Sequence, residues 1–140
     1  MKRILYAIFV TSVIAAAFAM TGCRSMSHNG RLDGFWKIVT IENTATGEVT
    51  PANSEYYYSF YRDVMNLKDT KSVKNITGKF NYHKGDDKIT IEYPYIENDQ
   101  MYELEPYGIY ENPVTFEILK LTGSELVLKS DHSIVSCIKF

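Results

Sequence analysis

The chain has 140 residues, of which 45% are hydrophobic and 23% are charged, so it can form one folded domain behind a short targeting segment. Its 17 acidic residues outnumber its 15 basic residues, which gives a formal net charge of −2. This balance has the wrong sign for a phosphate-binding surface, and the sequence contains no basic face. We therefore expect no nucleic-acid partner.

The N-terminal segment, residues 1–22, is typical of a secretory signal. Lys2 and Arg3 precede an apolar run, residues 4–20, that is interrupted only by a Thr-Ser pair. Such a run is somewhat short for a transmembrane helix, which needs about 20 apolar residues. Its length and its basic N-terminal flank match the apolar region of a signal peptide.

The segment ends at Met20-Thr21-Gly22-Cys23, where small residues precede a cysteine. This ending resembles the lipobox of bacterial lipoproteins, with Met20 at a position where that motif usually has Leu. The resemblance implies cleavage after Gly22 and attachment of diacylglycerol to the thiol of Cys23, so that the membrane is a partner through lipidated Cys23. The alternative is an ordinary signal peptide with an incidental cysteine.

Residues 23–31 are polar and lack hydrophobic periodicity, so we expect a flexible tether between the membrane and a folded domain over residues 32–140. In similar lipoproteins of gut bacteria, acidic residues just after the lipidated cysteine mark export to the cell surface, and this tether has none. The resemblance implies a lipid anchor in the outer membrane, with the periplasmic face favoured over the cell surface. Lipidation of Cys23 would leave Cys137 without a disulfide partner, and we expect a small, half-buried apolar residue there rather than an intermolecular disulfide.

Apolar and polar side chains alternate with a period of two residues through residues 32–140, and no helical stripe follows residue 31. The clearest example is Ile89, Ile91 and Tyr93, which alternate with polar neighbours. Short runs of this kind separated by turn residues predict an antiparallel meander, and closure of a meander removes its exposed edges. The sequence therefore predicts an all-β fold, a small antiparallel up-and-down β-barrel of about eight strands.

Two stretches interrupt the alternation. Residues 43–53 are rich in Thr, Gly and Pro and predict a surface loop. Residues 94–113 are too long for a structureless loop in a compact domain, so we expect one strand and a lid over one mouth of the barrel. We expect the short turns at 62–63, 84–87 and 131–132 at the opposite, closed end.

The motif Gly34-Phe35-Trp36 opens the first predicted strand and holds the only Trp of the chain. It resembles the Gly-x-Trp signature of lipocalins, and the ending from Phe116 to Phe140 is similar to the lipocalin-like domains of lipoproteins from gut Gram-negative bacteria. The resemblance covers residues 32–140 and implies a lipocalin-like barrel whose closed end is filled by Trp36. It supports the fold more than an activity, because one fold serves many functions.

No constellation of catalytic or metal-binding residues is visible in the sequence. His28, His83 and His132 lack the spacing of metal ligands, the serines lack a nucleophile frame, and no glycine-rich phosphate loop is present. We therefore expect no enzyme, no cofactor and no metal site.

Aromatic residues are unusually frequent, with 11 Tyr and 7 Phe. We expect most of them inside the barrel, where they form either a solid core or the walls of a pocket for a small hydrophobic or aromatic ligand. The predicted ligand-binding residues are Trp36, Tyr56, Tyr58, Phe60, Phe80, Tyr82, Tyr93, Met101, Tyr107 and Phe116. Thr40, Gly78 and Ser136 are the inward positions predicted to leave room.

These features favour a membrane-anchored, lipocalin-like lipoprotein that binds its ligand in the barrel, with entry at the mouth covered by residues 94–113. The alternative is a non-enzymatic interaction or structural lipoprotein whose barrel is filled and whose rim loops contact a protein partner. The volume of the barrel interior separates these two hypotheses.

Overall fold

The computed structural model describes residues 27–52 and 55–140. The predicted signal peptide, the lipidation site Cys23 and the first part of the predicted tether lie outside the described residues. The described strands are β1 (Gly34–Asn43), β2 (Val49–Pro51), β3 (Tyr56–Tyr61), β4 (Val64–Asp69), β5 (Lys74–Asn81), β6 (Lys88–Glu92), β7 (Val114–Leu121), β8 (Glu125–Lys129) and β9 (Ser133–Lys139). Three short 3₁₀ helices accompany them: η1 (Gly30–Leu32), η2 (Asn98–Glu103) and η3 (Glu105–Tyr107).

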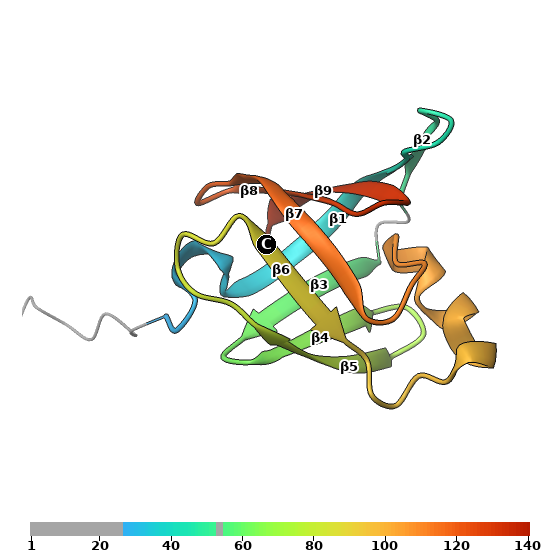
Figure 1. Ribbon diagram of the computed structural model, residues 1–140, viewed down its shortest axis with the longest axis horizontal. Helices are drawn as coiled ribbons and strands as arrows, with labels where there is room; N and C mark the ends of the chain where they lie inside the picture. Colours follow the sequence, from blue (N-terminus) through green and yellow to red (C-terminus); the bar gives the residue numbers. More distant parts are fainter. Residues whose placement is uncertain (1–26, 53–54) are drawn as a thin grey trace, which may run out of the picture.

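The strands form one antiparallel sheet in the order β2-β1-β3-β4-β5-β6-β7-β8-β9, and β1 also pairs with β9. Since β1 has β3 on one side and β9 on the other, β1 and β3–β9 close into a barrel (Figure 1). The predicted up-and-down barrel of about eight strands is confirmed. Among the described residues, no helix combines the length and the hydrophobicity needed to cross a membrane.

The extra strand β2 belongs to a hairpin that the sequence pattern did not predict, because residues 43–53 had indicated only a loop. It pairs with the distal half of β1, from Thr40↔Pro51 to Glu42↔Val49, and the hairpin projects beyond the barrel wall (Figure 1). The free edge of β2 is short and ends in Pro51, which has no N–H to offer. Such an edge pairs poorly with another strand.

A β-bulge in β1 determines which side chains of the hairpin face the barrel. The register between β1 and β9 shifts between Ile38 and Thr40. The extra residue reverses the alternation beyond it, so that Ile41 packs against the core instead of Thr40. The prediction that Thr40 faces inward is therefore wrong.

One end of the barrel is closed by η1 and Trp36. The Trp36 side chain is fully buried, and its indole Nε1–H donates a hydrogen bond of 2.8 Å to the carbonyl oxygen of Leu32. The ammonium group of Lys139 lies 4.2 Å from the centre of the indole ring. The predicted role of Trp36 as the residue that fills the closed end is confirmed.

Contacts at the closed end extend into the stretch that was predicted as a tether. Asn29 is only 2% exposed, and its side-chain amide donates hydrogen bonds of 2.7 Å to the carbonyl of Arg62 and to a carboxylate oxygen of Asp33. The polar composition of this stretch had indicated a tether. Its asparagine instead satisfies backbone and carboxylate groups at the closed end.

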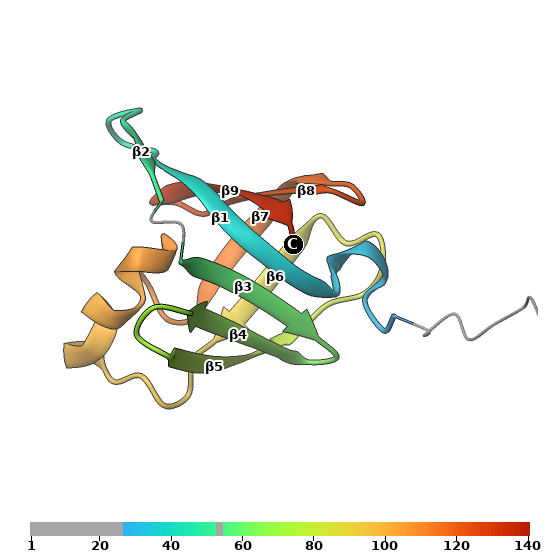
Figure 2. The ribbon, with the colours of Figure 1, turned by 180° about the vertical axis from the view of Figure 1, so that it is seen from behind.

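The opposite end, the mouth, is covered by residues 94–113, which contain η2 and η3 and no strand (Figure 2). The predicted strand in this segment is wrong, and the predicted cover over one mouth is correct. Met101, Leu104 and Tyr107 recur every three residues, which matches the three residues per turn of a 3₁₀ helix. Leu104, Tyr107 and Ile109 are buried members of the core, so they form a plug at the mouth.

Candidate functional site

The interior of the barrel is filled by its own side chains. A void large enough for a water molecule would leave part of the surrounding side chains accessible. Most of the inward side chains have at most 1% of their surface accessible, and Ile76 and Phe80 are exposed by 7% and 6%. The residues at or below 1% are Leu32, Trp36, Ile38, Tyr58, Phe60, Met65, Leu67, Ile89, Ile91, Tyr93, Leu104, Tyr107, Ile109, Val114, Phe116, Leu126, Leu128 and Val135.

The predicted ligand-binding residues fall into three groups. Those buried in the single core are Trp36, Tyr58, Phe60, Phe80, Tyr93, Tyr107 and Phe116. Tyr56 and Met101 pack against this core at the mouth, where the rings of Tyr56 and Tyr107 meet edge to face at 5.1 Å. Tyr82 follows β5 at the closed end and is only partly buried, so it lies far along the barrel from the mouth residues.

The buried tyrosine hydroxyls mostly have partners within the core. The Tyr58 hydroxyl donates to the carbonyl oxygen of Tyr107, and the Tyr93 hydroxyl donates to the sulfur of Met65 at 3.4 Å. Burial raises the pKa of both hydroxyls far above the ordinary value of tyrosine. Among the described residues, the hydroxyl of Tyr107 is the one buried side-chain polar atom without a hydrogen-bond partner.

Two further inward positions differ from their predictions. Gly78 faces inward as predicted, but the ring of Tyr93 fills the room beside it, and a Cβ atom there would lie 2.7 Å from a ring carbon. Ser136 is on the outer side, because the buried residues of β9 are Ser133, Val135 and Cys137. Alternation could not reveal this, since the residues on both sides of β9 are largely apolar. Cys137 is a free thiol and is more deeply buried than predicted.

The turn at 131–132 lies at the mouth, contrary to the prediction that it belongs to the closed end. Strand β8 runs toward the mouth, so the turn that follows it meets the β1–β2 hairpin. The backbone N–H of Thr44 donates to the carbonyl of His132 at 3.1 Å. The ring of His132 also contacts the ring of Tyr110 at a centroid distance of 6.2 Å.

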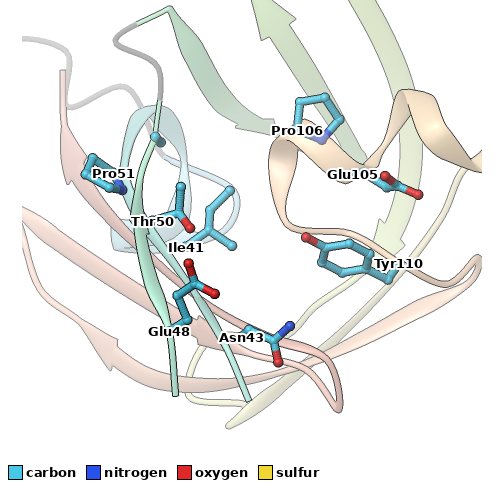
Figure 3. Close-up of a pocket in the computed structure, with 9 residues that line it drawn as sticks. Ile41, Asn43, Glu48, Thr50, Pro51, Glu105, Pro106 and Tyr110 are labelled. Atoms are coloured by element: carbon cyan, nitrogen blue, oxygen red, sulfur yellow. The ribbon is translucent and has the colours of Figure 1, made fainter. Parts of the chain in front are cut away.

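An open cleft of about 330 Å³, which we call the rim cleft, lies outside the barrel at the mouth, between the β1–β2 hairpin and η3 (Figure 3). Figure 3 shows Ile41 and Tyr110 on its two sides, with Glu48 and Asn43 along the hairpin. The lining residues are Ile41, Asn43, Glu48, Thr50, Pro51, Ala52, Glu105, Pro106 and Tyr110. None of them is among the ten predicted ligand-binding residues, because the cleft depends on a hairpin that the sequence had indicated as a loop.

Most polar side chains that line the rim cleft retain groups without a hydrogen-bond partner among the described residues. The side-chain oxygen of Asn43 accepts hydrogen bonds from the backbone N–H groups of Ala45 at 2.9 Å and Thr46 at 3.2 Å. The turn uses only the oxygen of the Asn43 side chain, so its NH₂ group can donate hydrogen bonds to a ligand in the cleft. Tyr110 is 46% exposed, so both its ring and its hydroxyl are accessible to a ligand.

Tyr110 also separates the rim cleft from a smaller hollow of about 190 Å³, lined by Asn43, Thr44, Ala45, Tyr110, Asp131 and His132. Because Asn43 and Tyr110 line both hollows, the two form neighbouring parts of one surface. A larger hollow of about 520 Å³ lies outside β6–β8 and has a mainly polar lining, which offers an apolar ligand little contact. In the described part of the chain, no group of three His, Cys, Asp or Glu residues is arranged to hold a metal ion.

Comparisons with known proteins agree with this architecture. A family model described as a lipocalin-like domain matches residues 18–140. The crystal structure of a lipocalin-like protein from Bacteroides uniformis matches with a TM-score of 0.64 and 23% identity, over 79% of this chain and 100% of that chain. An uncharacterized protein from Bacteroides eggerthii matches with a TM-score of 0.63 and 16% identity, over 77% of this chain and 98% of that one. No curated protein matches the chain.

The family match confirms the predicted resemblance to lipocalin-like domains. Solved structures at these levels of identity show a shared fold alone. What this chain binds therefore depends on its own side chains.

Proposed function

Since this chain belongs to the lipocalin-like domain family, we propose that it is a non-enzymatic binding protein that holds a small ligand in the rim cleft rather than inside the barrel. One observation carries this proposal. The barrel interior is filled by side chains, while an accessible, partly apolar cleft of about 330 Å³ lies beside the mouth. That volume is at the lower end of the range for small-molecule sites.

The energetic cost of binding inside the barrel supports this choice. A ligand could enter only if Leu104, Tyr107 and Ile109 left the mouth, and all three are buried. Exposure of a large apolar side chain costs about 1.5–3 kcal/mol, so displacement of the plug would weaken binding by several kcal/mol. Binding in the rim cleft requires no such opening.

One observation favours the predicted interior site as a second candidate. The Tyr107 hydroxyl is buried without a partner among the described residues, and a ligand or water molecule that reached it would relieve that cost. An interior site would use the aromatic residues predicted from the sequence, and it would require the plug to move.

We also propose that Cys23 anchors the protein in the outer membrane, on the periplasmic side. The order of basic residues, apolar run and small residues before the cysteine supports this proposal. Residues 23–29 can span about 20 Å when extended, and Asn29 lies at the closed end. An anchored domain would therefore hold its closed end near the bilayer and its rim cleft away from it.

The anchor is tested by Cys23→Ser, which should abolish lipid labelling and release the protein from the membrane fraction. Membrane association and mass that are unchanged from wild type would contradict the anchor. The position of the anchor does not affect the choice between the two candidate binding sites.

The binding site is tested by a screen of small apolar and amphipathic compounds against the mature protein, with dissociation constants measured for each hit. Tyr110→Ala removes the ring between the two rim hollows and should weaken a hit that binds there about fivefold or more, since a ring contact is worth about 1 kcal/mol or more. The matched control is Tyr102→Ala, an exposed tyrosine of η2 outside the cleft lining. Hits that are insensitive to Tyr110→Ala would contradict the rim site.

A further inference from the structure

The rim cleft carries a charge pattern that points to a ligand class, and this inference rests on the proposed function. We propose that the cleft selects a small organic cation, an amine with a compact apolar body. The ammonium group would lie near the carboxylate of Glu48, and the body would pack against Ile41 and Tyr110.

The side chains that line the rim cleft carry negative charge that no basic side chain of the lining balances. In the part of the cleft that the structure describes, the lining contains two carboxylates, Glu48 and Glu105, and no Lys, Arg or His. The ion pairs of the described residues are Lys74–Glu103, His83–Asp86, Lys120–Glu125 and His132–Glu111, so neither cleft carboxylate belongs to one. Two unneutralised carboxylates beside a partly enclosed surface raise the local concentration of cations.

The two carboxylates differ in geometry. Figure 3 shows Glu48 on the hairpin side beside Ile41, Thr50 and Asn43, whereas the carboxylate of Glu105 is directed away from the centre of the cleft. Glu48 is therefore the carboxylate placed to contact a bound ammonium group. Glu105 adds to the negative electrostatic potential at the rim.

The site also has an apolar part. The β-bulge of β1 turns Ile41 toward the cleft, and Pro106 of η3 lies on the other side. The half-exposed ring of Tyr110 is accessible to a ligand in the cleft, and aromatic rings attract cations in addition to apolar groups. A ligand with both a charge and an apolar body makes contacts that a hydrated metal ion would not.

The lining of the rim cleft disfavours an anionic ligand. The remaining polar groups of the lining are the amide of Asn43 and the hydroxyls of Thr50 and Tyr110, which are all neutral. They can donate hydrogen bonds, but they cannot balance the repulsion between an anionic ligand and two carboxylates. For ligands of equal shape, the cation should therefore bind most tightly, the neutral molecule less tightly and the anion most weakly.

A matched series of probes tests this order: phenethylammonium, phenethyl alcohol and phenylacetate. Dissociation constants are measured by ligand-observed NMR with the mature lipidated protein in detergent micelles, and empty micelles serve as the blank. We expect phenethylammonium to bind about tenfold or more tightly than the alcohol, and phenylacetate to bind more weakly than both. Added salt should weaken the binding of the cation more than that of the alcohol.

Glu48→Gln should bring the affinity for phenethylammonium close to that for the alcohol and leave the affinity for the alcohol unchanged. The control is Glu92→Gln, which removes the same charge from an exposed position of β6 outside the cleft and should have no effect on either probe. Equal loss in both variants would show a long-range charge effect and overturn the role of Glu48.

The remaining outcomes separate the ligand class from the site. If the three probes bind equally and Tyr110→Ala weakens all of them, the site stands and the selectivity for cations is wrong. If Tyr110→Ala changes none of them, the rim site itself is wrong. If phenethylammonium does not bind at millimolar concentration, the proposed ligand class is wrong, while hits of other chemistry would still test the site.

Discussion

The two ends of the barrel are sealed in different ways. At the closed end, the indole N–H of Trp36 is satisfied by the carbonyl of Leu32, and Lys139 covers the ring. At the mouth, the plug of Leu104, Tyr107 and Ile109 leaves the hydroxyl of Tyr107 without a partner in the described part of the chain. The closed end is thus sealed with the indole N–H satisfied, whereas the mouth is sealed with one buried hydroxyl unsatisfied.

The attachment of the plug shows the same contrast. An ion pair of 2.9 Å between Lys74 and Glu103 joins η2 to β5, and its side chains are exposed by 43% and 21%. Exposed pairs of this kind contribute little to stability. The end where a ligand would bind is therefore the end with the weaker local structure, as binding segments generally are.

The largest expected effect concerns the closed end. Trp36→Ala should lower the free energy of unfolding by about 3–5 kcal/mol, because it removes a buried large aromatic side chain and leaves a cavity. Urea unfolding followed by circular dichroism measures this change. A loss below about 1 kcal/mol would show that the closed end does not hold the barrel together.

The next effect concerns the barrel wall between the two ends. Gly78→Ala should cost about 1–3 kcal/mol, because its new methyl group would lie 2.7 Å from a ring carbon of Tyr93. The control is Gly123→Ala, where a Cβ atom meets no other atom within 4 Å, and its expected change is within about 0.5 kcal/mol. Equal unfolding midpoints for the two variants would indicate a loose interior.

Alkaline pH should destabilise the tyrosine-rich core. Burial raises the pKa of the hydroxyls of Tyr58 and Tyr93, so the native state retains protons that the unfolded chain releases above about pH 10. The stabilisation is fully present below pH 10 and is lost as the pH rises further, by about 1.4 kcal/mol per tyrosine at pH 11. Urea midpoints measured between pH 8 and pH 11 that do not fall would contradict the filled core.

A pair of hydroxyl deletions tests the mouth directly. Tyr58→Phe removes a donor and leaves the carbonyl of Tyr107 without it, which should cost about 1–3 kcal/mol. Tyr107→Phe removes the unpartnered hydroxyl and should be neutral or stabilise the fold by about 1 kcal/mol. If Tyr107→Phe destabilises the protein as much as Tyr58→Phe, the Tyr107 hydroxyl has a partner and the contrast between the ends fails.

The smallest expected effect is that of Glu103→Gln. Loss of the exposed ion pair with Lys74 should change the global free energy of unfolding by less than about 0.5 kcal/mol. Hydrogen exchange at the amides of Leu104, Tyr107 and Ile109 should nevertheless become faster, because the plug is held less firmly. Unchanged exchange at all three amides would show that the ion pair does not fasten the plug.

Local patterns in the sequence predicted most of the barrel. Alternation and turn residues predict β3–β9, and the Gly-x-Trp motif predicts the position of Trp36. These features follow from short-range chemistry, the pleat of a strand and the preference of a large aromatic residue for burial. The filled core is consistent with the many bulky residues on the inward faces.

The candidate site could not be predicted, because it depends on contacts between distant segments. The bulge that turns Ile41 inward is a register shift against β9, which no pattern within β1 reveals. The hairpin had weak signals in Asn43, Gly47 and the β-branched pair Val49-Thr50, but a position beside η3 follows only from closure of the barrel. The wrong assignment of Ser136 has a similar origin, since β9 has apolar residues on both faces.

We propose that ligands bind in the rim cleft while the barrel interior stays filled. An amide chemical-shift map of the mature protein, titrated with the tightest hit from the compound screen, tests this claim most directly. We predict shifts at Ile41, Thr50 and Tyr110 that saturate together, with the amides of Tyr58 and Phe116 unchanged. Shifts centred on Tyr58, Phe116 and the plug, with the rim amides unchanged, would contradict the claim and place the ligand inside the barrel.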